Sequence, residues 1–265
     1  MVAMPDAAPA RTPAAPPSWT ARHCVRALLA ASLMLASTAG CARQGTDVTP
    51  GQAFENPGNA QLAAAVTGGD ETLARELIAA GANPNALDEQ GQPLLQWAMK
   101  RGDRDAFRLL LALGADPAQG NRDGRTALHL AAMGKSEGWL DALLEHGMSP
   151  DTPNTVTGAT PLYDALRADS EDNIDVLLRA GARLDVADRN GTTPLHQAAL
   201  VKDSAAVLRF LEGGADPRAT DRTGATFQDY LYRGDPKLLN AATRRHLEKI
   251  DAWLQAKGIA VQPRG

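Results

Sequence analysis

Residues 188–217, DRNGTTPLHQAALVKDSAAVLRFLEGGADP, contain the pattern on which the fold prediction rests. Thr193 and Pro194 open an alanine- and leucine-rich run, and both favour a helix start. Proline in the first turn sacrifices no internal hydrogen bond, and a preceding threonine can cap the helix. A second apolar run ends at Gly214, a residue that readily adopts the left-handed conformation that closes helices. The stretch predicts two short helices preceded by a polar turn, in which Asp188 bonds the turn backbone.

This pattern recurs along the chain at a nearly constant spacing. A first series of glycines is spaced by 33 or 34 residues: Gly58, Gly91, Gly124, Gly158, Gly191 and Gly224. A second series follows the first by 23 residues: Gly81, Gly114, Gly147, Gly181 and Gly214. The single extra residue lies between Gly147 and Gly158, where it lengthens one turn and leaves the helices in register.

Each unit has an apolar face on both predicted helices. In the first helix a leucine and an alanine three residues later share one face; the pairs are Leu95 and Ala98, Leu128 and Ala131, Leu162 and Ala165, and Leu195 and Ala198. The second helix supplies an apolar pair, such as Leu177 and Leu178. One unit cannot bury these faces alone, so stability is expected to come from stacking on neighbouring units.

Over residues 58–224, and with a weaker pattern to residue 258, the sequence resembles the ankyrin repeat. The resemblance implies an all-α ankyrin-repeat solenoid of five to six units including caps, with a period of about 33 residues. Units start near residues 58, 91, 124, 158, 191 and 224, and residues 58–258 form the domain.

The two ends of the repeat region depart from the pattern. Unit 58–90 lacks the Thr-Pro pair and is interpreted as an N-terminal cap. At the other end Gln228 replaces the core leucine, so residues 224–258 are interpreted as a C-terminal cap. It should end in a longer helix with three inward apolar residues: Leu247, Ile250 and Leu254. Residues 259–265 are expected to be a tail.

Residues 1–40 resemble a bacterial lipoprotein signal peptide. Arg22 and Arg26 precede an apolar run, and small residues lead to Cys41. The run is too short to span a bilayer, which needs ~20 apolar residues. The resemblance implies cleavage before Cys41 and diacylation of its sulfur, although Thr38 stands where such signals usually have leucine. Ordinary secretion with an unmodified Cys41, or an uncleaved segment, are the alternatives.

The residue after the cysteine bears on the destination. Ala42, where aspartate would favour retention in the inner membrane, resembles the lipoproteins that are released to the outer membrane. Residues 41–57 are polar, with proline and glycine, and are expected to form the lipidated cysteine and a flexible tether. The predicted location is the bacterial cell envelope, anchored in the outer membrane and facing the periplasm, with a soluble periplasmic or secreted protein as the alternative.

Composition and motifs argue against several kinds of chemistry. The net charge of −4 and pI of about 5.7 disfavour a nucleic-acid binder. Cys24 and Cys41 are the two cysteines, so the repeat region has no disulfide or thiolate ligand. His129 and His196 occupy one slot of the repeat, which by resemblance bonds backbone between neighbouring units. We therefore predict no catalytic, cofactor-binding or metal-binding residues, no small-molecule substrate and no enzyme activity.

Ankyrin repeats resemble one another in presenting hairpin tips and inner helices as a concave strip, and the family's positions can be transferred to this chain. The predicted partner-binding residues are Lys100, Arg101, Arg122, Arg125, Met133, Arg167, Arg189, Leu200, Val201, Arg222 and Arg233. Basic side chains dominate, which predicts a protein partner with an acidic surface. The alternative is that exposed arginines only keep the array soluble. Trp97 is interpreted as packing between helices.

The predicted function is a monomeric, non-enzymatic protein-binding module on a lipid anchor at Cys41, which is its only expected contact with a membrane. One specific role is an immunity protein against a toxin that acts in the periplasm. The alternatives are an envelope scaffold, an accessory factor in stress protection such as peroxide detoxification, and a secreted host-directed effector.

Overall fold

The computed structural model describes residues 49–134, 138–234 and 238–264. These belong to a compact unit that runs from Thr46 to Gly265. The predicted signal peptide and Cys41 lie outside the described residues. Within the described ranges the extended pairing is limited to one isolated β-bridge, between Leu87 and Pro93, so the all-α prediction is confirmed. None of the described helices combines the length and apolarity that crossing a bilayer requires.

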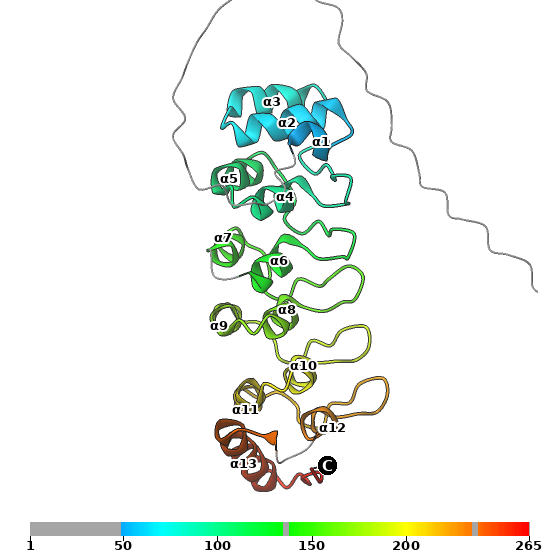
Figure 1. Ribbon diagram of the computed structural model, residues 1–265, viewed down its shortest axis with the longest axis vertical. Coiled ribbons are helices and arrows are strands. Elements are labelled where there is room, and N and C mark those ends of the chain that lie inside the picture. The colour runs from blue at the N-terminus through cyan, green and yellow to red at the C-terminus, as the bar shows by residue number, and fades with distance from the viewer. Residues whose placement is uncertain (1–48, 135–137, 235–237, 265) are drawn as a thin grey trace, which may run out of the picture. The chain divides into compact units, whose positions relative to one another are not determined.

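The described helices form six pairs that stack in chain order (Figure 1). The inner helices are α2 (Pro57–Thr67), α4 (Leu94–Lys100), α6 (Ala127–Met133), α8 (Pro161–Arg167), α10 (Pro194–Leu200) and α12 (Phe227–Leu231). The outer helices are α3 (Glu71–Ala79), α5 (Arg104–Ala112), α7 (Trp139–Glu145), α9 (Glu171–Arg179), α11 (Ser204–Glu212) and α13 (Ala241–Ala256). Each inner helix from α4 onward lies between a hairpin loop and its outer helix (Figure 1).

The helix ends follow the chemistry that the sequence predicts. Thr193 precedes α10 and Pro194 is its first residue. The outer helices α3, α5 and α11 begin after Asp70, Asp103 and Asp203, whose carboxylates each accept a backbone N–H of the first turn. These caps satisfy donors that have no partner within the helix.

The core is a continuous layer between the inner and outer helices. The predicted leucines Leu95, Leu128, Leu162 and Leu195 are at most 1% exposed. Ala98, Ala165 and Ala198 have no exposed surface, which lets neighbouring inner helices approach closely. The outer helices contribute aromatic side chains such as Phe107 and Phe210.

The hairpins are tied to one another through the backbone. The bonds are Arg122 N to Gly91 O (3.1 Å), Thr155 N to Gly124 O (3.0 Å), Arg189 N to Thr157 O (2.9 Å) and Arg222 N to Asn190 O (2.9 Å). The extra residue before Gly158 lies in such a hairpin, as predicted. There Gly158 N reaches back four residues to Asn154 O, whereas Gly91 N reaches back three, to Asp88 O.

Histidines on the inner helices α6 and α10 also reach the next hairpin. His129 Nε2 lies 3.0 Å from Ala159 O, and its Nδ1 accepts the Thr126 backbone N–H at 3.2 Å. Because Nδ1 accepts, the proton is on Nε2, which donates. His196 makes the same bond to Ala225 O at 3.1 Å, so the structural role predicted for both histidines is confirmed.

The N-terminal boundary differs from the sequence prediction, which placed a flexible tether through residue 57. Residues Pro50–Ala53 form a short helix, α1, and Phe54 after it is 2% exposed. The Phe54 ring packs edge-to-face on Trp97 at 5.8 Å, and Ala53 O accepts the Glu89 backbone N–H at 3.0 Å. This segment therefore supplies the contacts that a preceding hairpin makes elsewhere, and the folded array begins before residue 57.

The C-terminal boundary differs in the same way. Leu247, Ile250 and Leu254 of α13 are buried, as predicted. Residues 259–264 of the expected tail, however, pack on the last unit. Gln228 Nε2 donates to Ala260 O at 3.1 Å, and Gln228 Oε1 accepts the Gln262 backbone N–H at 2.9 Å. At this position the other inner helices have a leucine that packs in the core. In α12 the glutamine instead forms hydrogen bonds with the backbone of an extended segment, which takes the place of a further helical unit.

Replacing Phe54 by alanine tests the revised N-terminal boundary. Loss of a fully buried phenylalanine should lower the free energy of unfolding by about 3–5 kcal/mol. Urea denaturation measures this difference. Leu73→Ala, at a position 41% exposed, is the control and should change stability by less than about 1 kcal/mol. If the two variants lost equal, small amounts of stability, residues 50–54 would not be part of the core.

A second variant tests the histidine bond. Burial lowers the pKa of His129 from its ordinary value of 6.5, while the Ala159 carbonyl and Asp164 oppose the shift and Arg125 adds to it. As the pH is lowered, His129 is therefore protonated in the unfolded chain before it is protonated in the folded one. Its contribution to the free energy of unfolding is fully present above about pH 6.5 and falls below that pH, by at most ~1.4 kcal/mol per pH unit. His129→Gln keeps a donor for Ala159, as Gln96 does for its own neighbour, but does not titrate.

The free energies of unfolding of both proteins should therefore be compared at pH 7.5 and pH 5.5. Burial raises the pKa of Asp164, which adds stability as the pH falls and so acts in the opposite direction. We expect a smaller loss of stability on acidification in the glutamine variant. An equal loss in both proteins would contradict the assigned protonation state of His129.

Candidate interaction surface

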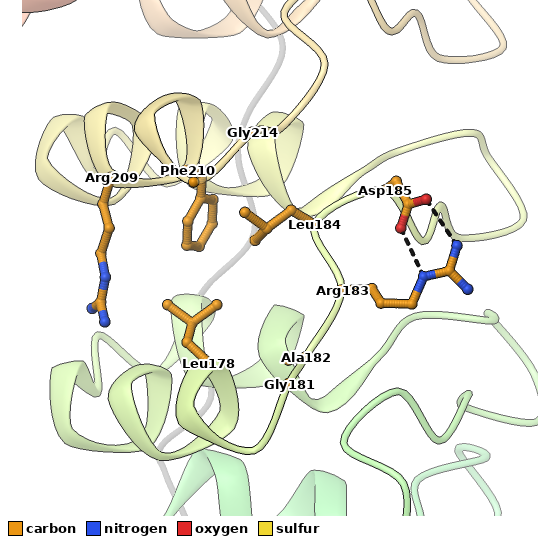
Figure 2. A pocket seen from close by; sticks show the side chains of 10 residues that line it. Leu178, Gly181, Ala182, Arg183, Leu184, Asp185, Arg209, Phe210 and Gly214 are labelled. Carbon is orange, nitrogen blue, oxygen red and sulfur yellow. Dashed lines mark hydrogen bonds and ion pairs between the residues drawn. The ribbon is translucent and has the colours of Figure 1, made fainter.

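The described residues contain no group of three or more histidine, cysteine, aspartate or glutamate side chains placed to hold a metal ion. A hollow of about 580 Å³ lies between the C-terminal ends of α9 and α11. Leu178, Leu184 and Phe210 gather at its centre, and Arg183 pairs with Asp185 at one side (Figure 2). The Arg183 side chain donates to both carboxylate oxygens of Asp185, at 2.9 and 2.8 Å.

This hollow is one of several at equivalent junctions. A hollow of about 290 Å³ lies between α3 and α5, and one of about 400 Å³ lies between α11 and α13. Their recurrence shows that they are grooves left where neighbouring outer helices stack. Their linings differ from one junction to the next, and none brings together an acid, a base and a nucleophile.

The predicted partner-binding residues lie in two rows. All are exposed except Arg125, which is half-buried. The first row follows the hairpins and contains Arg122, Arg189 and Arg222. The second row, named here the inner strip, follows the C-terminal ends of the inner helices and contains Lys100, Arg101, Met133, Arg167, Leu200, Val201 and Arg233. Their role in binding stays a prediction.

Arginines of the hairpin row take part in the fold. Arg122 Nη2 donates to Glu89 O at 3.4 Å, and Arg189 Nη2 donates to Thr155 O at 2.9 Å, each in the preceding hairpin. Gly91 adopts φ = 74°, and a Cβ added there would lie 3.3 Å from the Arg122 side chain. These arginines therefore lie closely against the neighbouring hairpin and help to hold it.

Arg125 is engaged with carboxylates. Its Nε lies 3.5 Å from Asp164 Oδ2, and its Nη1 lies 3.4 Å from Asp123 Oδ2. Asp164 is 5% exposed, and its burial raises the pKa of its carboxyl while Arg125 lowers it. Our sequence reasoning missed this pair. The available signal was a carboxylate at a repeat position that Trp97 and Leu130 fill in the two preceding units.

The inner strip combines basic and apolar side chains. Met133, Leu200 and Val201 are 43%, 45% and 38% exposed, and they are three of the seven large apolar residues that stand exposed in the described structure. The Arg101 guanidinium lies 4.9 Å above the Trp97 ring. Trp97 itself is 6% exposed, which agrees with its predicted packing role.

Two polar side chains that our sequence analysis did not single out hold the ends of inner helices. Asn173, 2% exposed, donates to Ala132 O at 2.9 Å and Gly134 O at 2.7 Å, which caps α6. Lys202 Nζ donates to Tyr230 O and, at 2.8 Å, to Arg233 O, which caps α12. Both contacts join neighbouring units and hold the C-terminal ends of inner helices, near which the residues of the inner strip lie.

Comparison with known proteins places these features in a family. A family model described as ankyrin repeats in three copies matches residues 61–154 and 139–221. Protein PhlB of Serratia liquefaciens is 43% identical over 76 residues, which are 29% of this chain and 34% of that protein. SH3 and multiple ankyrin repeat domains protein 1 of Homo sapiens is 35% identical over 100 residues, 36% of this chain and 4% of that protein. The chain thus spans about a third of the first of these relatives and a small part of the second.

Two further matches cover most of the protein to which this chain is similar. Cyclin-dependent kinase 4 inhibitor B of Mus musculus is 40% identical over 140 residues, 53% of this chain and 82% of that protein. The solved ankyrin-repeat domain of Bcl-3 superposes with a TM-score of 0.55 at 26% identity, over 71% of this chain and 80% of that chain. Since the family model covers more than half of the chain, and the stacked helix pairs and bonded hairpins agree with it, the chain belongs to the ankyrin-repeat family.

Proposed function

We propose that this protein is a non-enzymatic binding module that holds a protein partner with an acidic surface against the inner strip. The observation that carries the proposal is the strip itself. It presents exposed basic side chains on a chain whose net charge is −4, with half-exposed Met133 and Leu200 among them. Local charge of the opposite sign steers a partner into place, and apolar contacts add affinity once water is excluded.

The relatives support a binding role in general terms. One is, by its name, an inhibitor of a kinase, and the solved structure belongs to the IkappaB protein family. The family to which the chain belongs and these relatives support a non-enzymatic binding role. Because a fold does not determine a partner, the partner's chemistry must come from the surface residues.

We further propose that the array acts as a monomer in the bacterial periplasm, anchored in the outer membrane through acylated Cys41. The signal-like sequence before Cys41 supports this location. Helix α1 is capped by Thr49, and seven residues, 42–48, lie between this cap and the proposed anchor at Cys41. Such a segment extends at most ~30 Å, which would keep the strip close to the membrane.

The specific role that we propose is immunity to a toxin that acts in the periplasm. A small membrane-held module that covers an acidic surface on an incoming protein would meet it at its site of action. Expression of the chain should protect cells that receive the toxin encoded beside its gene, and expression of a strip variant should not. Protection by the strip variant would exclude this mechanism of immunity.

Cys41→Ala tests the anchor. The expected product of the unchanged chain is a lipidated protein that partitions into the detergent phase of a phase-separating detergent and carries two acyl chains on Cys41 by mass spectrometry. The alanine variant should stay in the aqueous phase. An unchanged chain that stays in the aqueous phase, with an unmodified thiol at Cys41, would show that the anchor does not form.

Charge reversal along the strip tests the binding role. The variant Lys100→Glu, Arg167→Glu and Arg233→Glu leaves the hairpin arginines intact, so the bonds of Arg122 and Arg189 remain. Capture from crosslinked cell envelopes, with the identity of each protein read by mass spectrometry, should yield one acidic protein with the unchanged chain and lose it with the variant. Thermal unfolding confirms that both chains fold. Equal capture by both chains would place the binding site elsewhere.

A further inference from the structure

Five equivalent positions of the inner strip alternate between basic and apolar chemistry. The ninth residue after each glycine of the first series, from Gly91 onward, is in turn Lys100, Met133, Arg167, Leu200 and Arg233. All five are exposed, and the two apolar ones are exposed to nearly the same extent, 43% and 45%. Four of the five are the last residue of their inner helix.

Stacking converts this alternation into a spacing. Packed helices lie about 8–10 Å apart, so a basic or apolar group recurs every ~16–20 Å along the strip. A ligand that matches all five positions must therefore present a side chain to the strip about every 8–10 Å, with acidic and apolar side chains in alternation.

The conformations open to a peptide differ in how they meet this spacing. A polyproline II segment returns to the same face every three residues, or ~9.3 Å, which falls within the required range. A β-strand returns every two residues, or ~6.7 Å, which does not. An α-helix comes nearest after seven residues, or ~10.5 Å, and would need about 29 residues to reach all five positions. An extended segment of about 13 residues is the shortest match.

We propose that the inner strip binds an extended, left-handed segment of its partner in which acidic and apolar residues alternate at every third position. This inference rests on the proposed function and specifies the partner's chemistry. Acidic side chains would face Lys100, Arg167 and Arg233, and apolar side chains would face Met133 and Leu200. A polyproline II segment has no internal hydrogen bonds and is already extended when free, so binding orders little of its backbone.

The chain's own N-terminal residues do not have this chemistry. Residues 1–48 contain two acidic residues, Asp6 and Asp47, against the arginines Arg11, Arg22, Arg26 and Arg43. A basic segment of this kind would be repelled by the strip, so the occupant is a separate protein.

A designed peptide tests the register. The probe EPALPAEPALPAE, blocked at both ends, places glutamate at positions 1, 7 and 13 and leucine at positions 4 and 10. The control EEEPALPAPALPA has the same composition with the three glutamates gathered at one end. Calorimetric titration of the purified full chain with each peptide at 50 mM and 200 mM salt should give affinity for the first peptide that is at least about tenfold higher than for the control.

Variants of the chain identify the positions. Arg167→Glu should weaken binding of the first peptide about tenfold or more, and Leu200→Ser about fivefold. Arg244→Glu, an equal change of charge at an exposed position on the outer helix α13, is the matched control and should leave the affinity unchanged.

The possible results separate the inference from the proposed function. Equal affinity for both peptides would show that charge alone attracts them and would overturn the inference. Absence of binding to either peptide would overturn it as well, while a strip-dependent capture from envelopes would leave the proposed function standing. Self-association of the chain that Arg167→Glu abolishes would identify a second copy as the occupant, which also contradicts the inference.

Discussion

Successive units are joined by one recurrent contact, in which a side chain of α4, α6, α10 or α12 donates a hydrogen bond to a backbone carbonyl of the segment that follows. Gln96 reaches Arg125 O at 2.8 Å, His129 reaches Ala159 O and His196 reaches Ala225 O. Gln228 closes the series by reaching Ala260 O in the C-terminal segment. The carbonyls of Arg125, Ala159 and Ala225 also accept a backbone N–H within their own hairpin, so the side-chain donor adds a second bond that joins one unit to the next. The contact also sets the position of one unit on the next, so it determines where the inner strip lies.

The periodic features of the sequence predicted most of the fold because they are local. Thr193 and Pro194 favour a helix start, and Gly214 with φ = 92° favours its end, whatever lies around them. The buried leucines and alanines follow from the same period. These features are sufficient to predict the number of units and the helix faces that pack against neighbouring units.

The ends of the array were predicted less well because their structure comes from tertiary contacts. Residues 50–57 are mostly polar with proline and glycine, and Phe54 is buried by tertiary contacts such as the one with the Trp97 ring. Residues 259–264 form no regular element, and they are ordered by Gln228 and by the ion pair of Arg264 with Asp251. The substitution of leucine by glutamine at position 228 was the visible sign, since a polar residue in a core position needs a partner.

The sequence predicted the basic and apolar side chains of the candidate surface, but it did not predict which arginines also hold neighbouring hairpins together. The arginines of the hairpin row and those of the inner strip have the same chemistry, so the sequence does not separate them. The structure does, because Arg122 and Arg189 donate to neighbouring hairpins and Arg125 faces the buried Asp164. The alternation of basic and apolar residues along the inner strip is set by the sequence, and the stacking of successive units brings these exposed side chains into one row. The same stacking produces the grooves between outer helices, whose linings vary from unit to unit.

Hydrogen exchange of the chain with and without its captured partner tests the central claim, that the inner strip is the binding surface. The account predicts slower exchange at the C-terminal ends of α4, α6, α8 and α10 and in the residues that follow them, with no change in the outer helices α5, α9 and α11. Protection centred on the grooves between outer helices, with unchanged exchange along the strip, would contradict it.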